Sequence, residues 1–157
     1  MTEPMTFPQR LELARFFDGS TTAWGMVIDR RGRVRRRFRA GIVGTRYDDR
    51  LVLDESFVFD DGERDTRVWT IEQDGASLSG VADDILDQAS GRLEGPMLRW
   101  SYDMMLPVGG RRVKVSFDDW MVLADHDIML SRADIRKFGI RFGEIVIAFR
   151  RDETASH

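Results

Sequence analysis

The sequence predicts an all-β protein, namely a closed, antiparallel, up-and-down β-barrel of about eight to ten strands with one short N-terminal helix. Apolar and polar residues alternate with a period of two over most of the chain, as in strands that have one buried face. Turn signals such as Asp60-Asp61-Gly62 and Asp74-Gly75 recur at short intervals, which favours sequential hairpins. A sheet of this size tends to curl, and closing it removes its exposed edges.

The only clear helical segment is expected at residues 8–17, and Asp18-Gly19-Ser20 ends it. Its apolar residues cluster on one side, so we expect the helix to plug one end of the barrel with that face. These residues are Leu11, Leu13, Ala14, Phe16 and Phe17.

Strands follow the helix in a regular order. The first five are expected at 23–28, 34–43, 51–59, 66–72 and 77–82. Residues 83–95 show no clear period, and only a short strand around Arg92 and Leu93 is predicted there. The remaining strands are expected at 97–106, 113–123, 128–132 and 140–150. The 157 residues are expected to form one domain (1–157) with its core at about 11–150. A barrel of this kind is lipocalin-like, and an open two-sheet sandwich is the alternative.

The informative residues are polar side chains that share the phase of a buried face. Glu55 lies in phase with Leu53 and Phe57, and Arg67 with Trp69 on the next strand, across the Asp60-Asp61-Gly62 hairpin. A buried charge is costly unless it is paired or hydrogen-bonded. The same phase places further polar or aromatic residues inside, namely Arg36, Trp100, Tyr102 and Asp119.

These residues suggest a ligand pocket in the barrel interior. Arg36, Glu55, Arg67, Tyr102 and Asp119 would form its polar network. Trp69 and Trp100 would supply apolar wall, and a mostly apolar lining with a few convergent polar groups is typical of small-molecule sites. Two other interpretations remain open: a purely structural ion-pair network, or a bulge that reverses the register and turns some of these side chains outward.

Metal, cofactor and nucleophilic chemistry have little support. The chain has no cysteine and two histidines, His126 and His157, so no cofactor and no metal site is expected. Asp118 and Asp119 are adjacent in a predicted strand and therefore point to opposite faces. The Gly residues form no phosphate-binding motif.

The seven arginines of residues 30–39 resemble an anion-binding patch at first sight. Because the net charge is −3 and these arginines alternate with apolar residues, we expect a solvated strand face and no nucleic-acid binding. No apolar run is long enough to span a membrane, and a cytoplasmic location is expected. An exposed apolar patch around Trp120 and Val122, extended by Trp24 and Met26, would suit a homodimer.

Several motifs in combination resemble an uncharacterised bacterial domain family of unknown function over residues 11–149. They are Arg36-Arg37-Phe38, Leu53-Asp54-Glu55-Ser56-Phe57, Asp61-Gly62-Glu63, Arg67-Val68-Trp69, Asp118-Asp119-Trp120-Met121 and Lys137-Phe138-Gly139. Some members of that family look like lipoproteins with a lipidated N-terminal cysteine, which would anchor them in the cell envelope. This sequence has no cysteine, and the resemblance implies no activity or catalytic residue.

Three functions remain in competition. The first is binding of a small amphipathic or lipid-like ligand in the barrel interior. The second is a cofactor-independent enzyme, of the isomerase or hydrolase-like kind, in which Glu55 is the general base and Arg36, Arg67 or Tyr102 stabilises negative charge. The third is a structural or self-association module. An interior filled with side chains would count against the first function, and a saturated Arg67–Glu55 pair in an occluded core would count against the second. A monodisperse monomer at high concentration would count against self-association.

Overall fold

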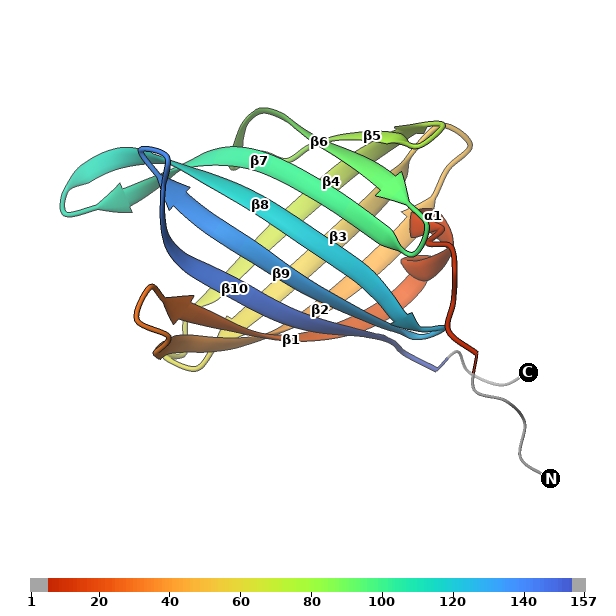
Figure 1. Cartoon of the computed structure of the whole chain (residues 1–157), viewed down its shortest axis with the longest axis horizontal. Coiled ribbons are helices and arrows are strands. Elements are labelled where there is room, and N and C mark those ends of the chain that lie inside the picture. Colours follow the sequence, from red (N-terminus) through yellow and green to blue (C-terminus); the bar gives the residue numbers. More distant parts are fainter. Residues whose placement is uncertain (1–5, 154–157) are drawn as a thin grey trace.

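The computed structural model describes residues 6–153, in which ten strands close into one antiparallel barrel. Figure 1 shows the strands wrapped around a shared interior, with the helix at one end. Strands that follow each other in the chain pair with each other, and β1 closes the barrel by pairing with β10. The elements are α1 (Leu13–Phe16), β1 (Gly19–Asp29), β2 (Val34–Arg46), β3 (Leu51–Phe59), β4 (Arg64–Asp74), β5 (Ser77–Val81), β6 (Ile85–Glu94), β7 (Met97–Val108), β8 (Arg111–Asp125), β9 (Ile128–Lys137) and β10 (Ile140–Arg151).

The predicted all-β, up-and-down barrel with a short N-terminal helix is therefore confirmed, and closure excludes the open sandwich. The helix is shorter than predicted, because α1 covers four residues of the expected 8–17. The segment before it is held by other bonds: the Leu11 N–H donates to the Gly95 carbonyl, at 2.9 Å, in the turn between β6 and β7. This backbone pairing replaces the first turns of the expected helix.

Strand β6 lies within residues 83–95, where the sequence shows no clear period. Its pairing with β7 shifts register between Leu86 and Ser90, and Asp87 has a positive φ of 52°. A bulge of this kind interrupts the alternation locally: Asp87, which has the phase of the buried Ile85 and Ala89, is exposed. The stretches on either side of the bulge are too short to show a clear period in the sequence.

One end of the barrel is filled by α1 and the residues around it. Leu11, Leu13, Phe16 and Phe17 are buried, and the Phe17 ring meets the Phe149 ring edge-on with centroids 5.8 Å apart. Phe17 also packs closely against Gly44 on β2. A glycine is required there, because a Cβ at this position would lie 1.6 Å from the Phe17 carbonyl oxygen. The predicted plug is thus present, and it seals this end with apolar contacts.

The outer face of the barrel is covered by charged side chains. The arginines of β2 follow the predicted alternation, since Arg35, Arg37 and Arg39 are exposed. Trp24 and Trp120 are partly exposed on this face, and arginine guanidinium groups lie over both rings, Arg150 at 4.9 Å and Arg99 at 4.4 Å from the ring centroids. Among the described residues, no helix is long and apolar enough to cross a membrane.

Candidate ligand-binding site

The barrel interior contains a partly open cavity of about 290 Å³, which extends from Phe149, beside the plug, toward the end opposite α1. Inward-facing residues of β1, β2, β3, β4, β7, β8 and β10 line it, together with Asp84 from the turn between β5 and β6. Most of the wall is aliphatic or aromatic, and Phe38, Phe57 and Ile145 are typical members. The volume lies close to the lower limit of small-molecule pockets, which begin at about 300 Å³.

Six of the seven residues that the sequence placed in the pocket line this cavity. Each of these side chains points into the barrel, as the alternation of inward and outward positions along its strand predicts. The inward and outward faces of β3, β4, β7 and β8 are therefore as expected. The six residues are Glu55, Arg67, Trp69, Trp100, Tyr102 and Asp119.

Arg36 differs from the prediction, because it is not part of the cavity wall. It has the inward phase of Phe38 and Ala40, but it lies on the part of β2 that pairs with β1 and extends beyond the β2–β3 ladder, which begins at Phe38. Its guanidinium group therefore meets the turn between β3 and β4, where it donates to Asp61 and Glu63 and lies 3.6 Å from the centroid of the Phe59 ring. Arg36 stabilises the rim and belongs to no interior network.

Glu55 and Arg67 are direct cross-strand partners on β3 and β4, yet Arg67 forms its ion pair elsewhere. The Arg67 Nε donates to Asp84 at 2.9 Å, and the Arg67 Nη2 lies 2.8 Å from the same carboxylate. Glu55 makes no ion pair within residues 6–153. The sequence interpretation missed Asp84, because it lies in a turn where the period of two carries no information.

Burial dominates the acid–base properties of the cavity residues. Desolvation raises the pKa of Glu55 to about 7, against the opposing effects of the Arg67 charge and the Trp69 side chain. Desolvation also raises the pKa of Asp119 to about 6, although Ser131 on β9 donates a 2.8 Å hydrogen bond to this carboxylate. The pKa of the Tyr102 hydroxyl rises to about 12 for the same reason. The site therefore holds two carboxyl groups that can change protonation near neutral pH.

Aromatic rings form a continuous wall beside these carboxyl groups. The Trp69 ring meets Trp100 and Tyr102 edge-on, with centroids 5.5 Å and 5.3 Å apart. Tyr102 stacks on Phe117 with centroids 5.0 Å apart. Such contacts fix ring orientation, so the wall is preorganised and needs little rearrangement to receive a ligand.

The paired carboxylates of β8 behave as strand geometry requires. Asp118 faces outward, where it accepts bonds from Arg99 and Ser101, and Asp119 faces the cavity. Within residues 6–153, no group of three or more His, Asp or Glu side chains is arranged to hold a metal ion. The titratable side chains that line the cavity carry carboxyl, phenol and guanidinium groups.

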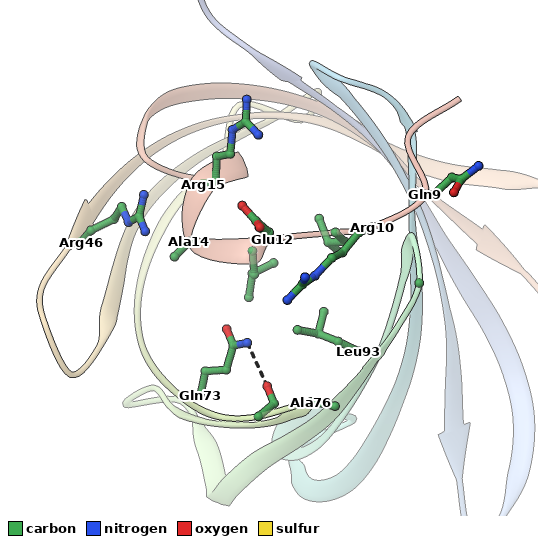
Figure 2. A pocket seen from close by; sticks show the side chains of 13 residues that line it. Gln9, Arg10, Glu12, Ala14, Arg15, Arg46, Gln73, Ala76 and Leu93 are labelled. Atoms are coloured by element: carbon green, nitrogen blue, oxygen red, sulfur yellow. Dashed lines mark hydrogen bonds between the residues drawn. The ribbon is translucent and has the colours of Figure 1, made fainter. Parts of the chain in front are cut away.

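A larger hollow of about 570 Å³ lies outside the closed end (Figure 2). Arg10, Arg15, Arg46 and Gln73 line it, and Gln73 donates a 2.9 Å hydrogen bond to the Gly75 carbonyl. All four of these side chains are exposed, so their polar groups remain hydrated. Because polar interactions are weaker in water than in a desolvated site, the smaller interior cavity is the better candidate for specific binding.

The fold and the cavity define a lipocalin-like barrel with a mostly apolar interior site. Residues 4–151 match the model of a family described as proteins of unknown function, DUF3833, and the chain belongs to this family. The resemblance found from the sequence motifs is thereby confirmed. A comparison with curated proteins finds no significant match.

Two experimental structures share the fold. A protein of unknown function from the DUF3598 family of Nostoc punctiforme has 18% sequence identity and a TM-score of 0.66, covering 93% of this chain and 51% of its own. This chain therefore spans about half the length of the Nostoc protein. The S-type phycobiliprotein lyase CPES from Guillardia theta has 10% identity and a TM-score of 0.67, covering 92% of this chain and 93% of its own. At such identities the likeness concerns the fold alone.

Proposed function

We propose that this protein binds a small amphipathic ligand inside the barrel. The observation that carries the proposal is the interior cavity of about 290 Å³, in which an apolar and aromatic wall surrounds the half-buried carboxyl group of Glu55 and the buried one of Asp119. A domain that only needed stability would gain by filling this space with side chains, because cavities and buried polar groups both reduce stability.

The polar groups of the cavity also suit recognition. Glu55 has no ion-pair partner among residues 6–153, and Tyr102 on β7 contributes a half-buried phenol to the same cavity. Polar groups that are desolvated and lack a partner carry a free-energy cost. A ligand that supplied a hydrogen bond or a compensating charge to Glu55 and Tyr102 would remove that cost and so bind more tightly. The phycobiliprotein lyase shares this barrel shape, and its name indicates action on a protein that carries a pigment. That likeness agrees with a ligand-binding barrel and does not identify the ligand.

The first experiment measures whether the interior accepts an apolar molecule. The neutral dye N-phenyl-1-naphthylamine, whose fluorescence rises in apolar surroundings, is titrated into the purified protein. Ala40 lines the cavity, and Ala40→Leu places three further carbon atoms inside it. We expect this variant to weaken dye binding by about tenfold or more, equivalent to about 1.4 kcal/mol.

Val43→Leu provides the matched control, because Val43 lies on the same strand but is 57% exposed on the outer face. It should leave dye affinity unchanged. Equal dye binding by both variants and the original protein would place the dye outside the barrel and contradict the proposal. Native mass spectrometry of gently purified protein then identifies any ligand that remains bound.

One observation favours proton transfer as a second candidate function. The pKa of Glu55 is raised to about 7 by burial, and a general base is most effective when its pKa lies near the working pH. Arg67 and Tyr102 line the same cavity and could stabilise negative charge on a substrate. In deuterium oxide, the protein should then incorporate deuterium into an acidic C–H bond of the recovered ligand, and Glu55→Gln should not. Binding without exchange would leave only the carrier function.

A further inference from the structure

The charged residues that line the cavity are strongly unbalanced in sign. Four of them carry carboxyl groups and one carries a guanidinium group: Glu55, Asp65, Asp84 and Asp119 against Arg67. Arg67 is already ion-paired with Asp84, so its charge is largely compensated. An anionic ligand would therefore be repelled by the negative charge of the site. Arg67, the one cationic side chain in the lining, already pairs with Asp84.

Glu55 and Asp119 approach the cavity from opposite walls. In the barrel order, β3 and β8 are five strands apart in either direction, so the two acidic residues belong to diametrically opposed strands. Asp119 accepts one hydrogen bond from Ser131, and neither acid forms an ion pair among residues 6–153; the Arg67 charge acts on Glu55 only at longer range and lowers its pKa. A buried carboxylate without a cation is destabilised in the empty site. A positive charge in the space between the two walls would remove that penalty.

The aromatic wall has the complementary chemistry for such a charge. Trp69 and Tyr102 line the cavity, and the Arg67 guanidinium group lies 5.8 Å and 6.0 Å from their ring centroids, so both rings already have a cation nearby. Phe57, two positions from Glu55 on β3, also lines the cavity and has no such cation over it among residues 6–153. Ring faces attract ammonium groups, and the attraction reaches about 2 kcal/mol where water is excluded. Protein sites for organic cations combine ring faces with carboxylates, and both are present here.

We propose, on the basis of the ligand-binding function above, that the ligand is a small organic cation: a protonated amine with an apolar body, whose charged group lies against Glu55. The apolar body would then occupy the part of the cavity lined by Phe38, Phe57 and Ile145. This proposal specifies the polar head group of the amphipathic ligand as a cationic amine. It excludes fatty acids and other anions as ligands.

Binding should depend on pH because the cation needs an ionised Glu55. The groups that influence this carboxyl are Arg67 on β4, Asp84 in the turn between β5 and β6, and Asp54 on β3. Tyr102 on β7 stays neutral up to high pH, since its pKa is about 12, and Asp119 on β8 ionises near pH 6. Affinity for a cation should therefore fall as the pH is lowered through about 7 and fall further through about 6.

The test uses three probes with the same tail and different head groups: octylamine, octanol and octanoate, each at pH 8.5. An alkylammonium remains protonated there, as lysine does with a pKa of about 10.4. Binding is followed by isothermal titration calorimetry and by the fluorescence of Trp69 and Trp100, which line the cavity. We expect octylammonium to bind about tenfold more tightly than octanol, and octanoate to bind most weakly.

Two variants assign the effect to one carboxyl group. Glu55→Gln keeps the size of the side chain and removes the charge, and it should abolish the preference for octylammonium over octanol. Asp54→Asn is the matched control, because Asp54 is the adjacent residue on β3 and is exposed on the outer face. It should keep the preference. If Glu55→Gln does not fold, the original protein titrated from pH 8.5 to pH 5.5 replaces it: affinity for octylammonium should fall about tenfold and affinity for octanol should stay constant.

The outcomes separate the two proposals. Equal binding of octanol and octylammonium at pH 8.5, or tightest binding of octanoate, would overturn the cation proposal and leave the ligand-binding function standing. If none of the three probes and no dye binds, both proposals fall. A preference for octylammonium that Glu55→Gln retains would also overturn the assignment to this carboxyl.

Discussion

The two ends of the barrel are built from the same ten strands, but their interiors are opposite in character. At one end α1 and Leu11 fill the space with apolar side chains, and Phe16 and Phe17 are each 3% exposed. Toward the other end the strands enclose a cavity, and polar residues such as Glu55 and Arg67 enter its wall. The difference lies in what occupies the interior and not in the pairing of the strands.

This contrast separates a filled, apolar end that contributes to stability from the cavity that we propose as the binding site. The plug buries apolar surface, which is the main favourable contribution to folding. The cavity retains desolvated carboxyl groups and empty volume, both of which reduce stability. The predictions below disturb one end at a time and test whether the effects remain separate, starting with the largest.

Phe16→Ala should have the largest effect on stability because it removes a fully buried ring from the plug. Buried Phe-to-Ala substitutions cost about 3–5 kcal/mol, from lost apolar burial and from the cavity that remains. The free energy of unfolding is measured by urea denaturation. Phe7→Ala is the control: Phe7 is 70% exposed, and the change should stay within about 0.5 kcal/mol. Comparable losses in both variants would show that the helix does not seal the barrel.

Glu55→Gln should change how stability depends on pH. The pKa of Glu55 rises from 4.5 to about 7 on folding, so between these values the folded state binds more protons and stability falls as the pH rises. One pKa unit corresponds to about 1.4 kcal/mol, which gives a loss on the order of 3 kcal/mol in the original protein. The variant should lack this loss and retain the smaller one from Asp119. Parallel curves from pH 4.5 to pH 7.5 would mean that Glu55 is hydrated.

Gly44→Ala tests the close contact between β2 and the plug. A Cβ there would lie 1.6 Å from the Phe17 carbonyl oxygen, so α1 must move. Overpacking of this kind costs about 1–3 kcal/mol. Gly41→Ala on the same strand meets no atom within 4 Å and should be almost neutral. Thermal denaturation compares the two variants, and dye binding in the cavity should persist in both.

Arg37→Gln should have the smallest effect. Arg37 pairs with Asp60 at the rim of the cavity end, at 3.1 Å, but its side chain is 75% exposed. Exposed ion pairs contribute about 0–1 kcal/mol and are screened by salt. Any loss of stability should therefore disappear in high salt. A larger, salt-independent loss would indicate that the rim has a structural role equal to that of the plug.

Much of the site could be predicted from the sequence because strand alternation is a local property. The phase of Glu55 relative to Leu53 and Phe57 places its side chain inside whatever the neighbouring strands do. The same reasoning failed for Arg36, because phase does not tell where a strand leaves the barrel. It also failed for Asp84, whose contact with Arg67 joins residues 17 positions apart through a turn without regular period.

The sequence by itself determined the antiparallel barrel, the apolar plug and the inward direction of six site residues, since hydrophobic alternation and turn chemistry act over a few neighbouring residues. Only the tertiary structure decided that Arg67 pairs with Asp84 and leaves Glu55 without an ion pair in residues 6–153. It also decided that Asp119 faces Glu55 from the opposite wall. Barrel closure brings distant strands around one interior, and the desolvation that raises the pKa of both carboxyls exists only after that closure.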